Sequence, residues 1–173
     1  PTTDLNADEN YNKLAAYTNF GFLFFDKLNL NLGSRADYFS PTTSKTFISP
    51  RFSTSYRLTD ITSLTFSTGI YHQAPSYIWL VGDKVNLELK NIRVNQFVLG
   101  VDQYFSADAL FRVEGFIKDY FDYPTSLRRT YLIMANTGAG FSGSDENFAS
   151  FGLDPLNSDG TGLAKGFEVS LQK

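Results

Sequence analysis

Apolar and polar residues alternate along much of this chain with a period of two. Segment 28–37 reads LNLNLGSRAD, segment 63–70 reads SLTFSTGI and segment 167–172 reads FEVSLQ. Such alternation indicates strands whose two faces meet different surroundings. Noisier versions of the pattern cover 14–25 and 94–105. Together these stretches predict strands at roughly 12–25, 28–39, 48–58, 63–73, 93–105, 110–123 and 162–173.

The lengths of the strands and of their connections favour a membrane barrel. Most predicted strands have about 11 to 14 residues, whereas soluble strands usually have about 5–6 and a membrane crossing needs about 9–11. Connections after the first, third and fifth strands are short, and those after the second, fourth and sixth are long. Outer-membrane barrels have this arrangement, with the short turns at the periplasmic end. The long connections run roughly over 40–47, 74–92 and 124–161.

The same alternation predicts which side chains face lipid and which face a lumen, because neighbouring positions on a strand point to opposite faces. We expect the lipid face to include Leu30, Phe52, Phe66, Leu99, Val113 and Val169. We expect the lumen face to include Ser67 and Gly100 and the charged residues Arg35, Asp37, Arg51, Asp102, Arg112, Glu114, Lys118 and Glu168. These charges either line a ligand path, contact a plug, or pair across strands. For pairing, we expect Asp102 beside Arg112 and Asp37 beside Arg51.

Composition fits a sheet with one apolar and one polar face. Aromatic residues make up 16% of the chain, with 17 Phe and 10 Tyr, yet the mean hydropathy is −0.20. No stretch approaches the roughly 20 apolar residues of a spanning helix. The chain has no Cys, which excludes disulfides and thiolate sites, and its net charge of −3 gives no basic surface for nucleic acid.

Seven strands cannot form a complete barrel of the usual even-numbered kind. An open sheet would leave unpaired backbone groups in lipid at both edges. We therefore expect residues 1–173 to be one section of a longer barrel chain.

Several segments, in order, resemble the barrel of TonB-dependent outer-membrane receptors, particularly those of Bacteroidota-type bacteria. The matching segments are LGSRADYF at 32–39, SPRFS at 49–53, YRLTD at 56–60, GIYHQAP at 69–75, EGFIKDY at 114–120 and GLAKGFE at 162–168. The resemblance implies a transmembrane antiparallel β-barrel of about twenty-two strands with an N-terminal plug domain, which we expect outside this chain. It also implies the outer membrane of a Gram-negative bacterium and energy supplied by TonB.

The resemblance implies active uptake of a nutrient, which could be an iron chelate, a vitamin, an oligosaccharide or a peptide. Its partners would be outer-membrane lipid, TonB acting through the plug and the nutrient itself, with a surface lipoprotein as a further candidate. Binding residues favour long loops on a rigid scaffold. The ligand-binding candidates are therefore Tyr77, Trp79, Arg128, Arg129 and Tyr131. The connection 124–161 is the leading element for recognition, although it could equally cover the barrel mouth.

Two other functions stay open. A barrel enzyme needs a Ser/His or Asp/His constellation, and the single histidine, His72, has no partner at such spacing. We expect no catalysis, no cofactor and no metal site, since Asp154, Asn157, Asp159 and Gly160 lack the alternating ligand spacing of a calcium loop. A passive porin, or a structural barrel subunit of a surface complex, would use the same strands.

Overall fold

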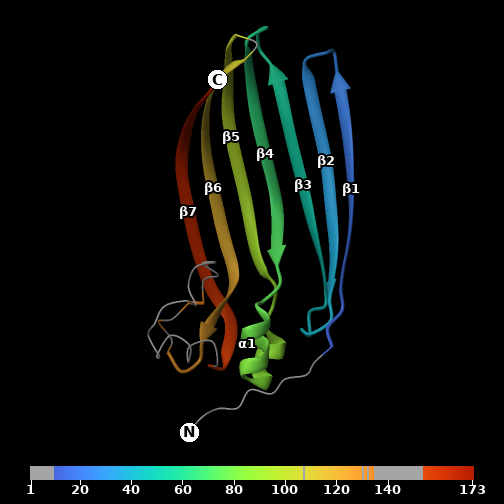
Figure 1. The fold of residues 1–173 in the computed structure, drawn as a ribbon, viewed down its shortest axis with the longest axis vertical. Helices are drawn as coiled ribbons and strands as arrows, with labels where there is room; N and C mark the ends of the chain where they lie inside the picture. The colour runs from blue at the N-terminus through green and yellow to red at the C-terminus, as the bar shows by residue number, and fades with distance from the viewer. Residues whose placement is uncertain (1–9, 107, 130, 132, 135–153) are drawn as a thin grey trace.

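The chain folds into one antiparallel sheet of seven strands that lie side by side in sequence order (Figure 1). The computed structural model describes residues 10–106, 108–129, 131, 133–134 and 154–173. The strands are β1 (Lys13–Phe24), β2 (Leu28–Phe39), β3 (Thr46–Arg57), β4 (Thr62–Gln73), β5 (Ile92–Ser106), β6 (Ala109–Ser126) and β7 (Leu156–Gln172). Two short helices, α1 (Tyr77–Gly82) and the 3₁₀-helix η1 (Lys84–Glu88), join β4 to β5.

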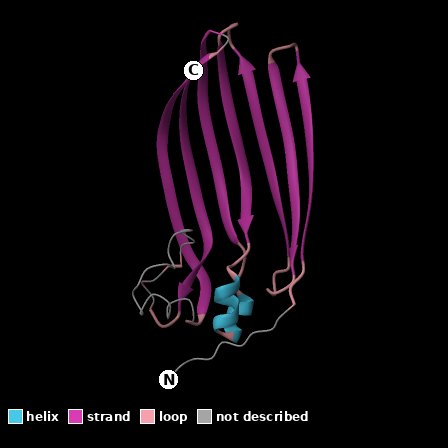
Figure 2. Cartoon of the chain, in the orientation of Figure 1, coloured by secondary structure: helices cyan, strands magenta, loops and turns pink. Residues whose placement is uncertain are grey.

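All seven predicted strands are present, and the three short turns share one end of the sheet (Figures 1 and 2). The first turn shows how little chain such a reversal needs. Phe25 and Asp26 both have φ of 53°, and the Lys27 N–H donates to the Phe24 carbonyl at 3.1 Å. Positive φ at both central residues is the type I′ geometry that matches the twist of a two-stranded hairpin. None of the helices in the described ranges is long and apolar enough to cross a bilayer.

The structure differs from the sequence prediction at the end that carries α1. The predicted loop 74–92 contains two helical turns, which are too short to show a helical period in the sequence. Strands β6 and β7 also extend beyond their predicted ends. Ser126 pairs with Leu156 past two register shifts, so the period-two pattern is interrupted there although the pairing continues.

Strand register places most of the large apolar residues on one side of the sheet and most of the charged residues on the other, with Arg93, Asp119 and Lys165 as charged exceptions on the apolar side. Directly paired residues share a face, and one such row runs Leu30, Thr54, Phe66, Leu99, Gly115 and Phe167. All six residues predicted to face lipid lie on this side, which we call the apolar face. All eight charged residues predicted to face a lumen lie on the opposite side, which we call the polar face.

The pairing between β3 and β4 stops halfway. It runs only from the pair Arg57 and Ser63 to the pair Arg51 and Gly69, whereas β3 stays paired to β2 as far as Thr46. Pro50 explains the stop. Its carbonyl oxygen would lie 3.1 Å from a Cβ placed on Gly69, so its backbone faces β4, and it has no N–H to donate there.

Buried apolar side chains gather beyond this split, at the α1 end, and not along the sheet. The group consists of Phe39, Trp79, Leu80, Leu89, Ile92, Met134 and Leu156, with Phe47, Ala74 and Tyr123 packed against it. It joins the connection between β4 and β5 to the start of β7. A single-layer sheet has no second layer to pack on, and many of its large apolar residues are exposed, including Leu99 at 62% and Phe167 at 80%.

Arginine should cost more folding free energy at Phe66, on the apolar face, than at a neighbouring position on the polar face. If the apolar face meets lipid, Phe66→Arg should cost about 2–4 kcal/mol near the bilayer midplane. Ser67→Arg is the matched control, because Ser67 lies next to it on the polar face and should cost far less. A folding titration of the full-length protein in lipid vesicles measures both. An equal loss of folding free energy in the two variants would contradict the assignment of Phe66 to the lipid side and Ser67 to the lumen side.

Candidate functional site

Two adjoining hollows lie on the polar face, and both are lined by Arg35 and Arg51. The first has a volume of about 410 Å³ and also involves polar side chains of β1 to β4, including Asn31, Ser53 and Ser67. The second, of about 420 Å³, reaches towards α1 and Tyr77. We call the two together the arginine recess. It occupies the region where β3 and β4 part.

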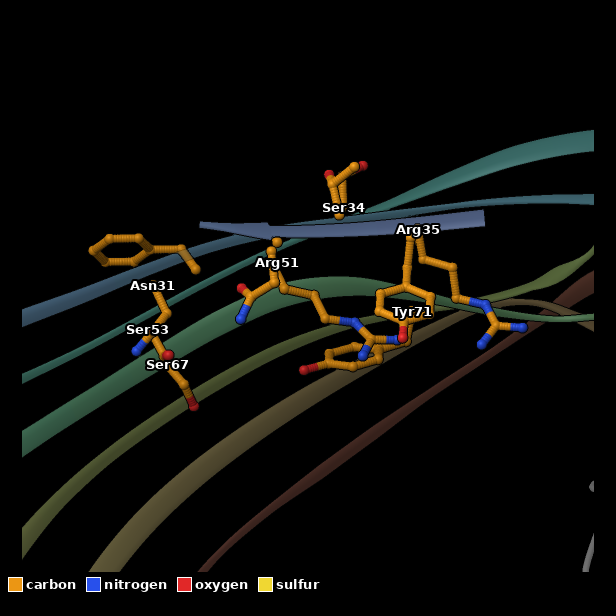
Figure 3. Close-up of a pocket in the computed structure, with 12 residues that line it drawn as sticks. Asn31, Ser34, Arg35, Arg51, Ser53, Ser67 and Tyr71 are labelled. Carbon is orange, nitrogen blue, oxygen red and sulfur yellow. The ribbon is translucent and has the colours of Figure 1, made fainter. Parts of the chain in front are cut away.

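Arg51 and Arg35 differ in their contacts. The Arg35 Nε and Nη2 atoms each donate to the Asp37 carboxylate at 2.8 Å, so this guanidinium is neutralised within its own strand. The Arg51 guanidinium carbon lies 4.6 Å from the centroid of the Tyr71 ring, a cation–π contact. Figure 3 shows both arginines projecting from the same side of the sheet, with Ser34 on the other.

The prediction that Asp37 pairs with Arg51 is wrong. Register places Arg51 opposite Gly33, and Asp37 opposite Phe47. Four residues along a strand correspond to about 13 Å, so Asp37 binds Arg35 instead. The other predicted pair is confirmed. Arg112 Nε and Nη2 donate to the two Asp102 carboxylate oxygens at 2.7 and 2.8 Å, across β5 and β6.

His72 lies where β3 and β4 have separated. Its Nδ1 is 3.1 Å from the Ser49 hydroxyl, and its ring centroid is 5.4 Å from that of Phe47. Side chains thus join the two strands where the backbone ladder is missing. Within the described ranges, no three or more His, Asp or Glu side chains are grouped so as to hold a metal ion.

The predicted ligand residue Trp79 is not available for stacking. It is only 1% exposed and belongs to the buried group at the α1 end. Tyr77 is 47% exposed, lines the arginine recess and stacks on Tyr11 with a centroid separation of 5.3 Å. Tyr131 is 84% exposed. Of the two predicted aromatic residues in the β4–β5 connection, therefore, only Tyr77 reaches the recess.

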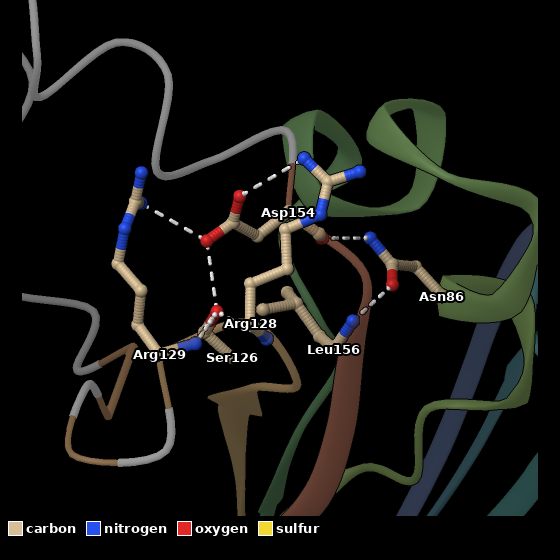
Figure 4. A network of polar contacts seen from close by, with 6 residues as sticks. All are labelled: Asn86, Ser126, Arg128, Arg129, Asp154 and Leu156. Atoms are coloured by element: carbon tan, nitrogen blue, oxygen red, sulfur yellow. Dashed lines mark hydrogen bonds and ion pairs between the residues drawn. The ribbon is translucent and has the colours of Figure 1, made fainter.

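Arg128 and Arg129 lie away from the recess, around the carboxylate of Asp154 (Figure 4). Asp154 is 2% exposed, accepts a hydrogen bond from the Ser126 hydroxyl at 2.8 Å and lies 3.0 Å from Arg129 Nη1. This contact ties the end of β6 to the residues before β7. Both arginines are therefore held in an intramolecular ion pair that the sequence alone did not indicate.

Asn86 completes the connection. It is fully buried, and its amide donates to the carbonyls of Trp79 at 2.6 Å and Asp154 at 3.1 Å, while its side-chain oxygen accepts from the Leu156 N–H at 2.7 Å. One side chain thereby joins α1, η1 and β7. Asp154 and Leu156 are needed for this packing, so a test of the loop must keep them. Most of the predicted recognition loop, including 138–144, lies outside the described residues.

Replacing Asn86 by alanine should loosen this end of the molecule and leave the sheet intact. Each buried group left without a partner costs about 1–3 kcal/mol. Hydrogen exchange of the full-length protein should therefore quicken in 77–91 and 154–156, with unchanged protection in the middle of β4 and β5. Asn29→Ala, at an exposed asparagine on β2, is the control and should change neither region. Unchanged exchange in Asn86→Ala would show that the bridge is dispensable.

Comparison with known proteins gives the family. Residues 1–172 match the family model described as TonB dependent receptor-like, beta-barrel. No curated protein matches the chain. The family is one of outer-membrane receptors that carry out TonB-dependent transport, and the predicted all-β barrel architecture is confirmed by the match and by the seven antiparallel strands. The chain therefore belongs to the β-barrel domain family of TonB-dependent receptors.

Proposed function

We propose that this chain forms part of the wall of an active-uptake receptor in the outer membrane of a Gram-negative bacterium. The apolar face contacts lipid, and the polar face lines the lumen. Further strands, supplied from outside residues 1–173, pair with the free edges of β1 and β7 and close the barrel. The observation that carries this proposal is the strand register, which places all six residues predicted to face lipid on one side of the sheet and all eight charged residues predicted to face the lumen on the other.

The orientation follows from the connections. Long barrel loops are extracellular and short turns are periplasmic, so the end with α1 and the Asn86 bridge faces the outside. The arginine recess then lies on the lumen wall below that opening, where a nutrient entering from outside would meet it. Arg112, Asp102 and Glu114 lie farther along, towards the turn end, and their mutual contacts support a role in satisfying charge within the wall.

The chemistry proposed is selective binding and passage, with no bond made or broken. Energy would come from TonB acting through a plug domain. The class of nutrient is the open part of this proposal, and iron chelates, vitamins, oligosaccharides and peptides are the candidates. A surface lipoprotein could cover the α1 end as a further partner.

Uptake should stop when either the receptor or TonB is removed. We would measure uptake of labelled ferric chelates, cobalamin, oligosaccharides and peptides by wild-type cells, by cells lacking the receptor gene and by cells lacking TonB. The expected result is at least one nutrient whose uptake is lost in both mutants and on collapse of the proton gradient. Receptor-dependent uptake that survives the loss of TonB would instead indicate a passive porin. Receptor deletion without effect on any nutrient would favour a structural subunit.

A further inference from the structure

Arg51 is an unneutralised cation on the polar face. Arg35, Arg112, Arg128 and Arg129 each lie within 4.0 Å of a carboxylate oxygen, whereas Arg51 has no such partner in the described part of the chain. Its guanidinium instead lies over the Tyr71 ring, which fixes one face of the group and leaves its N–H donors for another acceptor. An exposed arginine held in this way is preorganised to bind an anion.

The surroundings of Arg51 narrow the class of anion. The recess around it carries amide and hydroxyl groups from Asn19, Asn31, Ser53 and Ser67, together with the Tyr17 ring, which is 81% exposed. A planar guanidinium matches a carboxylate through two parallel hydrogen bonds. Amides and hydroxyls suit a ligand with many hydroxyl groups, and an exposed tyrosine offers a ring face to the apolar side of a sugar.

We propose that the arginine recess binds an acidic oligosaccharide, with one sugar carboxylate on Arg51. Tyr17, Asn31 and Ser53 contact the neighbouring sugar units. A single carboxylate suits the site because Asp37 already neutralises Arg35, so that of the two arginines in the recess only Arg51 lacks a carboxylate partner among the described residues. Phosphate groups, with up to two charges, favour several donors converging on one anion.

This inference rests on the proposed function, since it places the recess in the lumen of an uptake receptor. The test is therefore made by equilibrium binding, which needs neither TonB nor energy. Uptake that continues without TonB would overturn active transport and leave the binding result standing. TonB-dependent uptake of neutral nutrients alone would leave active transport standing and would count against an acidic oligosaccharide as the ligand.

The experiment uses isothermal titration of the full-length receptor in detergent with trigalacturonate and with neutral maltotriose. Trigalacturonate should bind at least tenfold more tightly than maltotriose. Arg51→Gln should weaken trigalacturonate binding by about tenfold to a hundredfold, the range for loss of hydrogen bonds to a charged group. Maltotriose binding should not change in Arg51→Gln.

Arg57→Gln is the matched control. Arg57 lies on the same strand and the same face, six residues or about 20 Å nearer the turn end, and should leave binding unchanged. Arg51→Lys keeps the charge without the planar fork and should bind with intermediate affinity. Circular dichroism and the amount of each variant in the outer membrane show that it has folded.

Three results would overturn the inference. In the first, the receptor does not bind trigalacturonate at millimolar concentration. In the second, Arg51→Gln binds trigalacturonate as tightly as the unaltered receptor does. In the third, Arg57→Gln loses as much affinity for trigalacturonate as Arg51→Gln does. The first would follow if a carboxylate of the receptor itself, from outside the described residues, already occupies Arg51.

Discussion

Backbone hydrogen bonding is the constraint on which the rest of this structure depends. A bilayer offers no water to unpaired N–H and C=O groups, so a chain that crosses it with strands must pair each strand with its neighbours. Antiparallel pairing in sequence order needs only short turns at one end and allows long connections at the other. The same pairing sets the two-residue alternation, because each face of the sheet then has one kind of surroundings. Fold and facing therefore follow from a single requirement.

The structure departs from this requirement where the candidate site lies. Pro50 cannot donate to β4, so the ladder ends beside Gly69 and the two strands separate towards α1. The Ser49–His72 contact joins them there. The arginine recess occupies the same region, so the break in regular pairing provides room on the wall for polar groups. At the same end, Asn86 and Asp154 hold the connections together with buried polar contacts, which are stable only when every group is paired.

The sequence predicted the strands and their two faces well because both depend on local alternation. A register slip of one residue would have moved the apolar side chains of a strand to the polar face. The sequence also predicted the Asp102–Arg112 pair, since a short turn fixes the register there. It failed for Asp37 and Arg51, where the longer connection 40–45 leaves the register free. It also missed the burial of Trp79 and the ion pairs of Asp154, because these contacts join segments that lie about 25 to 70 residues apart and carry no periodic signal.

Spin labels placed one at a time along β4 test the central claim, that one face of this sheet meets lipid and the other an aqueous lumen. Residues 1–173 contain no Cys, so single cysteines can be introduced there at each position from 63 to 70 of the full-length receptor in vesicles. Accessibility to oxygen should be high at 64, 66, 68 and 70, and accessibility to a water-soluble nickel complex should be high at 63, 65, 67 and 69. Equal accessibility at successive positions, or alternation with the opposite phase, would contradict the account.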